Sequence, residues 1–233
     1  MKNFFPIALI ALFATACSLD CEFGKGPVQH QELKVATFSK IKVDGAIDVT
    51  VEKGDTQRVT VEGESNLIPL VNTDVNGDSW RIGTSKCYST TQGLMVHIVT
   101  PNLASIDVEG SGSVKSGDVF GMGPVHFSCK GSGDITIDGI DAQELKLDIE
   151  GSGAITVKGT CSKLEGSLEG SGDLHGKDLT ANEAKLDVSG SGSATITAIT
   201  KLDAKVQGSG EIRYAGKPEV NSKVEGSGSV SPL

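Results

Sequence analysis

The stretch Ile149-Glu150-Gly151-Ser152-Gly153-Ala154-Ile155-Thr156-Val157 decides the fold, because close variants of it recur along the second half of the chain. Its Gly-Ser-Gly core occurs seven times, at successive steps of 21, 20, 19, 20, 18 and 18 residues. The copies begin at Gly110, Gly131, Gly151, Gly170, Gly190, Gly208 and Gly226. A period of about 20 residues is typical of a stacked repeat architecture, so each copy is predicted to be one structural unit repeated along an axis.

The residues that flank each Gly-Ser-Gly alternate between apolar and polar, which is the pattern of a half-buried β-strand. Leu147-Asp148-Ile149-Glu150 precedes one copy, and Ala154-Ile155-Thr156-Val157 follows it. A chain of hairpins would not need the same residues at every second turn, whereas a coil that returns to the same place stacks all seven motifs in one column. We therefore predict an all-β fold, a single-stranded parallel β-helix (β-solenoid) with coils of about 20 residues.

Strand parity predicts which side chains face the interior of the coil. Counting from Ile149, Gly151 and Gly153 would also point inward, and glycine tolerates the positive φ that a tight corner needs. Serine would stack on serine, with its hydroxyl donating to the neighbouring coil. The predicted inward positions are Val108, Cys129, Ile149, Leu168, Val188, Val206 and Val224 before the corner, and Val114, Ile135, Ile155, Leu174, Ala194, Ile212 and Val230 after it.

The N-terminus has the features of an export signal. Residues 4–13 are apolar but too few to span a bilayer, and Ala14-Thr15-Ala16-Cys17 resembles a bacterial lipobox. Residues 1–16 are therefore predicted to be a lipoprotein signal peptide, with Cys17 as the lipidation site and residues 17–32 as a lipid-anchored tether. The alternative is an ordinary secretory signal that is cleaved near the same place.

Charge and length limit the kinds of partner and the number of domains that this chain can have. Removal of residues 1–16 leaves 217 of the 233 residues and takes away one of 21 basic side chains, so 20 basic and 30 acidic residues give a net charge of −10. This charge disfavours nucleic acid and suits a domain held at a membrane by lipid alone. We predict one β-helix domain over residues 33–233, with about three irregular coils over 33–101 and regular Gly-Ser-Gly coils over 102–233.

Besides Cys17, the chain contains Cys21, Cys87, Cys129 and Cys161. Export permits disulfides, and four cysteines allow three full pairings, among which the sequence does not choose. Cys129 falls at an inward strand position, where a free thiol packs as a small apolar side chain. The spacing fits no zinc motif, and neither a metal nor a cofactor is predicted.

Residues suited to catalysis are scattered. His30, His97, His126 and His175 have no second metal ligand near them in sequence, and neither a nucleophile elbow nor a phosphate-binding loop is present. The residues that precede the Gly-Ser-Gly copies form one predicted column, consisting of Glu109, Lys130, Glu150, Glu169, Ser189, Gln207 and Glu225. Stacked carboxylates could attract calcium, but Lys130 interrupts them and a solvated outer face is favoured. We predict no catalytic, cofactor-binding or metal-binding residue.

Three parts of the chain resemble a known family. They are residues 38–49 (FSKIKVDGAIDV), residues 59–67 (VTVEGESNL) and the Gly-Ser-Gly series from Gly110 onward. From Val35 to Val230 the chain is similar to the bacterial envelope family described as putative auto-transporter adhesin, head GIN domain. The resemblance implies a β-helix ectodomain at the cell envelope and adhesion as a family label, and no binding residues come with it. In this chain Leu174-His175-Gly176 lacks the second apolar position of its strand, which predicts a looser coil.

The sequence therefore favours a non-enzymatic lipoprotein of a bacterial cell envelope, in the outer membrane, that presents a repetitive solenoid surface to a protein or glycan ligand. The alternative is a carbohydrate-active β-helix enzyme of the polysaccharide lyase or hydrolase kind. Such an enzyme needs a cleft with facing carboxylates or a basic cluster, usually with aromatic subsites. This chain has only three arginines, and its aromatic residues beyond the signal form no stripe.

Overall fold

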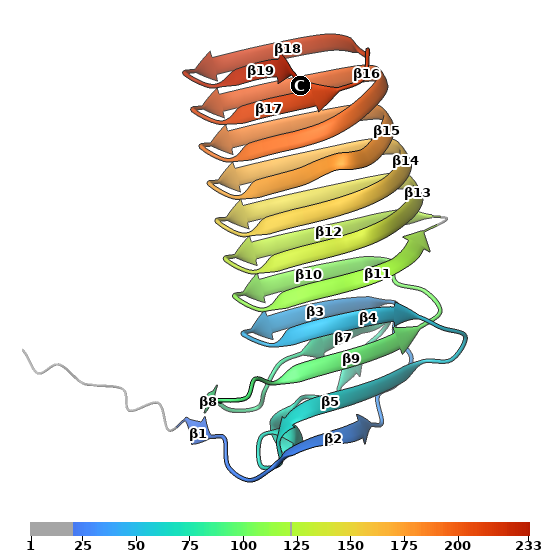
Figure 1. The fold of residues 1–233 in the computed structure, drawn as a ribbon, viewed down its shortest axis with the longest axis vertical. Helices are drawn as coiled ribbons and strands as arrows, with labels where there is room; N and C mark the ends of the chain where they lie inside the picture. The colour runs from blue at the N-terminus through green and yellow to red at the C-terminus, as the bar shows by residue number, and fades with distance from the viewer. Residues whose placement is uncertain (1–20, 122) are drawn as a thin grey trace, which may run out of the picture.

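A computed structural model describes residues 21–121 and 123–233, which form one elongated stack of β-coils (Figure 1). The regular coils contain β10 (Ser105–Gly110), β11 (Ser113–Gly121), β12 (Pro124–Gly131), β13 (Asp134–Gly151), β14 (Ala154–Gly170), β15 (Asp173–Gly190), β16 (Ser193–Gly208), β17 (Glu211–Ala215), β18 (Glu219–Gly226) and β19 (Ser229–Pro232). Among the described residues, the only helical turn is η1 (Ile68–Leu70), and no helix has the length and apolar character needed to cross a bilayer.

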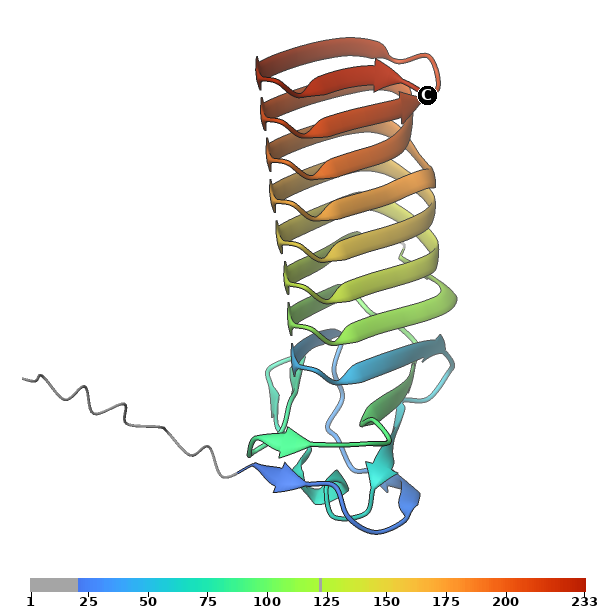
Figure 2. The ribbon, with the colours of Figure 1, turned by 60° about the vertical axis from the view of Figure 1, so that its left-hand side comes forward.

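Parallel pairing in constant register stacks each Gly-Ser-Gly on the next. The first glycines pair from Gly110 to Gly131, on to Gly151 and so through to Gly226. The strand ends before these corners line up along one edge of the stack (Figures 1 and 2). The predicted single-stranded parallel β-helix is therefore confirmed, and the spacing of the motif fixes which residue lies above which.

The predicted interior is confirmed for all but the last coil. Val108, Ile149 and Val188 are at most 1% exposed, as are most of their equivalents after the corner. Val224 was predicted to be buried, and this is wrong, because its side chain is 41% exposed. Val230 in the same coil is only half-buried. Both point to the inward side, but no further coil covers the last one.

The corner is held by backbone rather than by side chains. The Ser152 N–H donates to the carbonyl of Gly131 at 2.8 Å, and the Ser171 N–H donates to that of Gly151 at 2.8 Å. The coil-to-coil bond that we expected from the serine hydroxyl is thus made by the serine amide. Gly151 has φ of +121°, and a Cβ there would lie 2.5 Å from the Gly131 carbonyl oxygen. Its expected inward direction is therefore corrected: Gly151 abuts the backbone of the preceding coil.

Gly151→Val tests the corner. Both the left-handed φ and the contact with the Gly131 carbonyl oppose a side chain, so we expect a loss of about 2 kcal/mol or more in the free energy of unfolding. Gly117→Val is the matched control, since a Cβ at Gly117 meets no atom within 4 Å. Denaturant unfolding of both variants measures the difference. Equal stability of the two would contradict this account of the corner.

The N-terminal part continues the stack for less than the three coils predicted. β3 (Lys40–Gly45) and β4 (Asp48–Lys53) pair in parallel with β10 and β11, and below them lie β7 (Ser79–Ile82) and β9 (Met95–Thr100). β5 (Arg58–Glu64) then pairs antiparallel with β9, and β2 (Val28–Leu33) antiparallel with β5. These antiparallel strands, with the short β6 (Val75–Asn76) of a hairpin to β7, form a cap rather than a further coil.

Most of the predicted tether belongs to this cap. β1 (Glu22–Phe23) pairs with β8 (Tyr88–Ser89), and Cys21 forms a disulfide with Cys87. The tether predicted over residues 17–32 is therefore wrong from Cys21 onward, and residues 17–20 lie outside the described part of the chain. Cys129 and Cys161 are free and buried, so one pair forms and the other two thiols remain in the core.

A buried carboxylate of β5 in the cap is hydrogen-bonded to the loop that contains Thr90 and Thr91. Glu64 is 3% exposed and accepts hydrogen bonds from the Thr90 hydroxyl at 2.6 Å and the Thr91 amide at 3.1 Å. The hydroxyl of Thr90, followed by the amide of Thr91, outweighs the burial that opposes ionisation and lowers the pKa of Glu64. This interaction is complete above the usual carboxyl pKa and is lost as the pH falls through the lowered pKa.

Candidate functional site

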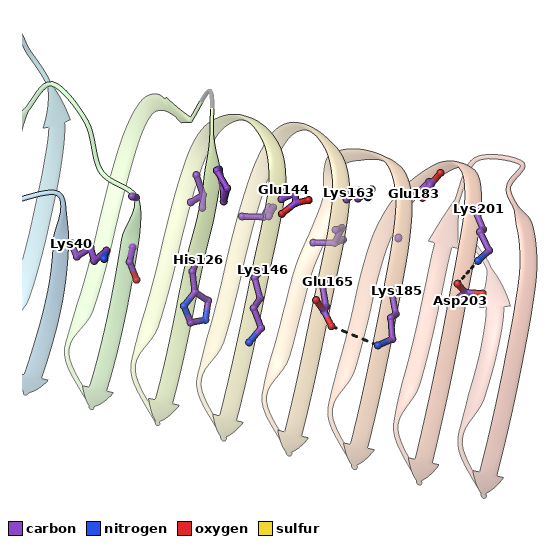
Figure 3. A pocket seen from close by; sticks show the side chains of 17 residues that line it. Lys40, His126, Glu144, Lys146, Lys163, Glu165, Glu183, Lys185, Lys201 and Asp203 are labelled. Carbon is purple, nitrogen blue, oxygen red and sulfur yellow. Dashed lines mark hydrogen bonds and ion pairs between the residues drawn. The ribbon is translucent and has the colours of Figure 1, made fainter. Parts of the chain in front are cut away.

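A groove of about 850 Å³ runs along one flank of the stack, across the start of β12 and the second halves of β13 to β16 (Figure 3). Its floor is the inward column Val125, Leu145, Leu164 and Ala184, whose side chains are 1–4% exposed. The walls are the outward side chains on either side of this column. The groove is therefore a product of the coil register and crosses several repeats.

Charge alternates along and across this groove. Each strand supplies one residue to each wall, two positions apart: Glu144 and Lys146 from β13, Lys163 and Glu165 from β14, Glu183 and Lys185 from β15, and Lys201 and Asp203 from β16. The register places the first member of each pair in one wall and the second in the other. The result is a checkerboard of four positive and four negative groups with no net charge. We call it the charge-alternating groove.

Some of these groups already pair with each other. Lys185 Nζ lies 3.6 Å from Glu165 Oε1, and Lys201 Nζ lies 2.6 Å from Asp203 Oδ2 (Figure 3). The hydrogen bond to Asp203 raises the pKa of Lys201. Exposed pairs of this kind contribute little to stability. Among the described residues, no ion pair within 4.0 Å involves Glu144, Lys163 or Glu183, so this wall has charges available to a ligand.

At the β12 end, Asp148 fixes the position of two groove residues. Its Oδ2 lies 2.7 Å from His126 Nε2 and 2.9 Å from Lys146 Nζ. Partial burial raises the pKa of Asp148, but hydrogen bonds from Lys146 and His126 outweigh it, and the pKa is lowered overall. Asp148 is therefore ionised at neutral pH and orients a ring and an ammonium group at the end of the groove.

The lining of the groove differs from the one that the carbohydrate-active alternative requires. A lysine stands across each strand from every carboxylate of the checkerboard, so no two carboxylates face each other directly over the floor. The lining residues include no Phe, Tyr or Trp on which a sugar ring could stack. In the described part of the chain, no three His, Cys, Asp or Glu side chains are grouped to hold a metal ion.

The predicted acidic column lies on the outer surface, and lysines neutralise much of it. Glu109 pairs with Lys42 at 2.8 Å, and Glu150 with Lys130 at 2.9 Å. Glu225 pairs with Lys223 at 2.6 Å, and the hydrogen bonds from Lys223 and Gln207 lower its pKa to about 2. Lysines of the same column and of its neighbour thus supply the positive charge that calcium would otherwise supply.

We therefore expect no calcium dependence. Calcium needs six to eight oxygen ligands, and the Glu150–Glu169 pair, one coil apart, can supply few of them. Addition of a chelator is expected to leave the melting temperature of the protein unchanged. Stabilisation by millimolar calcium well beyond that by magnesium, and its loss in Glu150→Gln, would instead establish a calcium site in this column.

Two of the scattered histidines meet in the cap. Antiparallel β2, β5 and β9 bring His30 Nδ1 to 3.6 Å and His97 Nε2 to 3.4 Å from Glu62 Oε2. His97 Nδ1 also lies 2.7 Å from the Thr50 hydroxyl. Sequence distance hid this cluster, because the antiparallel strands bring together residues that are 32 positions (His30 and Glu62) and 35 positions (Glu62 and His97) apart. Cys17, the one site residue that we predicted, lies outside the described residues.

The geometry defines a class of protein: a capped β-solenoid with a ligand-sized groove along its flank. The profile of the family described as "Putative auto-transporter adhesin, head GIN domain" matches residues 37–218. The chain belongs to this family, as its repeats predicted. A search of curated proteins finds no match.

Solved structures with the same fold include proteins from Bacteroides and Parabacteroides species. A putative adhesin from Bacteroides fragilis has a TM-score of 0.86 at 22% identity, and the match covers 91% of this chain and 99% of that one. At that identity the similarity shows the fold alone. A putative adhesin from Parabacteroides distasonis has a TM-score of 0.75 at 28% identity, covering 92% and 100%. A putative lipid binding protein from the same species has a TM-score of 0.76 at 25% identity, covering 91% and 98%.

Proposed function

We propose that this chain is a non-enzymatic, lipid-anchored adhesin of the bacterial outer membrane that holds an extended ligand in the charge-alternating groove. The observation that carries the proposal is the continuity of the groove over successive coils, with opposite charges alternating in both directions. Membership of a family described as adhesins supports the same function. An extended ligand would make many weak contacts, each repeated from coil to coil.

The checkerboard favours a polypeptide as the ligand. A uniformly anionic polymer, such as nucleic acid or an acidic polysaccharide, would meet as many carboxylates as lysines along either wall. A protein segment carries both signs of charge and can match the alternation. The structural neighbour described as lipid binding suggests a lipid as an alternative ligand. The floor residues, however, are at most 4% exposed and offer little apolar surface to an acyl chain.

Reversal of two groove lysines tests this function. Lys163→Glu with Lys185→Glu converts the centre of the checkerboard to negative charge, and binding to the ligand is expected to weaken by about tenfold or more, which is about 1.4 kcal/mol. Lys115→Glu with Lys177→Glu is the matched control, with the same change in net charge outside the groove. The readout is an array of envelope proteins and glycans, followed by titration of the proteins that bind.

Three outcomes would contradict the proposal. The two double variants could lose binding equally, the groove variant could bind like the wild type, or the protein could bind only the glycans of the array. Depolymerisation of an arrayed glycan by the purified protein would restore the enzyme alternative.

Two observations support the proposed anchor: the resemblance of residues 14–17 to a lipobox and the position of the disulfide. Cys21 is bonded to Cys87 in the cap, so only residues 18–20 separate the predicted lipid-bearing Cys17 from folded structure. Four residues of fully extended chain span about 14 Å. A lipidated Cys17 would therefore keep the capped end close to the bilayer, with the stack extending away from it.

Cys17→Ser tests the anchor. We expect it to abolish labelling with a fatty acid and to release the protein from the membrane fraction, because lipid is the proposed attachment. Labelling and fractionation of cells that express the wild type and the variant measure both effects. Retention of Cys17→Ser in the membrane fraction would count against the lipoprotein. If the wild type itself is neither labelled with the fatty acid nor found in the membrane fraction, the ordinary secretory signal would be favoured.

A further inference from the structure

The two ends of the stack are finished differently. At the N-terminal end, β5 and β2 cover the coils, whereas no strand of residues 21–121 or 123–233 lies over the last coil at the other end (Figure 1). All eight residues of β18 are exposed. Val220 and Val224 are 36% and 41% exposed, while their equivalents in the preceding coil, Leu202 and Val206, are at 0%. We call the surface formed by β18 and β19 the open end.

β18 presents an unpaired strand edge. In the described structure it pairs with β16 on one side only, so the backbone N–H and C=O groups on its other side have no strand partner. Such an edge is a template for a strand of another chain. The opposite end of a second copy does not match it, because β2 is antiparallel to β5 and covers only one side of the coil. The open end of a second copy does match it, and that contact closes after two molecules.

The charges of β18 select one register for such a contact. Two copies related by a two-fold axis pair antiparallel and symmetrically about one residue. With Asn221 at the centre, Glu219 of each copy faces Lys223 of the other, and Lys217, which lies just before β18, comes opposite Glu225. These four pairs all join opposite charges, which stabilises cross-strand pairing.

The neighbouring registers are worse. Centring on Ser222 sets Glu219 against Glu225, and centring on Lys223 sets the two lysines against each other. Centring on Val224 gives two opposite-charge pairs but places the first residues of β18 against the Gly-Ser-Gly corner, where the chain leaves the strand. Like charges opposite each other are destabilising.

We propose that two copies of this protein bind each other through their open ends, with β18 pairing antiparallel to β18 in the register centred on Asn221. The exposed Val220 and Val224 are covered in this contact. The caps then lie at the two far ends of the dimer. If the proposed anchor at Cys17 is correct, the two lipids point in opposite directions, and the contact joins two membranes; the dimer itself does not depend on the anchor or on the groove.

A single cysteine tests the register in the full-length protein. In Asn221→Cys, the two new thiols face each other across the axis, at a Cα separation of about 4.5–5.5 Å that suits a disulfide. Lys223→Cys is the matched control, equally outward and two residues away, but its thiol faces Glu219. Cys129 and Cys161 are buried and Cys21 is bonded to Cys87, and the wild type controls for Cys17. On mild oxidation we expect a covalent dimer from Asn221→Cys at least about tenfold faster than from Lys223→Cys.

Charge reversal provides a second measurement that also controls for folding. Glu219→Lys and Lys223→Glu should each weaken self-association by about tenfold or more, since each creates two like-charge pairs. Mixed together, the two variants should bind each other like the wild type, because every pair across the contact is again opposite. Analytical ultracentrifugation of each variant and of the mixture measures this.

Several results would overturn the proposal. They are a monomeric wild type, equal crosslinking of the two cysteine variants, open-ended oligomers instead of dimers, or crosslinking of Asn221→Cys to a different protein. Failure of the mixture to restore binding would reject the register. Loss of ligand binding in the groove variant, by contrast, bears on the proposed function and leaves the dimer unaffected.

Discussion

The close approach of the corner backbones is the constraint on which the rest of the structure depends. Each Gly-Ser-Gly lies directly on the one before, with amide and carbonyl in contact and no room for a Cβ at the first glycine. Because the corner admits no slip, the register of every strand that leads into it is fixed. Variation in length, from 18 to 21 residues per period, is absorbed in register shifts that occur away from the corner, such as that between Gly176 and Thr180. The coil with the missing apolar residue is closed there by Leu179, which is fully buried.

Fixed register arranges the outer side chains in columns. Each charged residue is therefore one member of a line of charges that crosses several coils. The groove, the acidic column and the open end are all consequences of this rule. In the acidic column, lysines from the next column or the next coil neutralise the carboxylates. In the groove, each coil reverses the order of charge of the coil before it. In the groove and in the paired part of the acidic column, positive and negative charges are therefore nearly balanced, although the chain as a whole has a net charge of −9.

Much of the fold could be predicted from the sequence, because the Gly-Ser-Gly period reports the coil directly. The groove was missed although its signal is present: before Gly151, Gly170, Gly190 and Gly208, the residues seven and five positions earlier have opposite charges, as Glu144 and Lys146 do before Gly151. The cap could not be predicted in the same way. The alternating pattern of Arg58–Glu64 is the same for a parallel and an antiparallel strand, and only the path of the chain sets its direction. Val224 was mispredicted because strand parity gives the direction of a side chain but not whether anything covers it.

The disulfide between Cys21 and Cys87 has a mechanical consequence for a protein held at its N-terminus. A pull on that end crosses directly from Cys21 to Cys87, so tension bypasses the intervening chain, 66 residues in sequence separation, and cannot strip β2 and β5 from the stack one strand at a time. Beyond Cys87 the load passes into coils whose hydrogen bonds run along the long axis of the molecule. Those bonds would share an axial load in parallel, so, if the proposed anchor at Cys17 is correct, the cap would serve as a fixed mount for the solenoid.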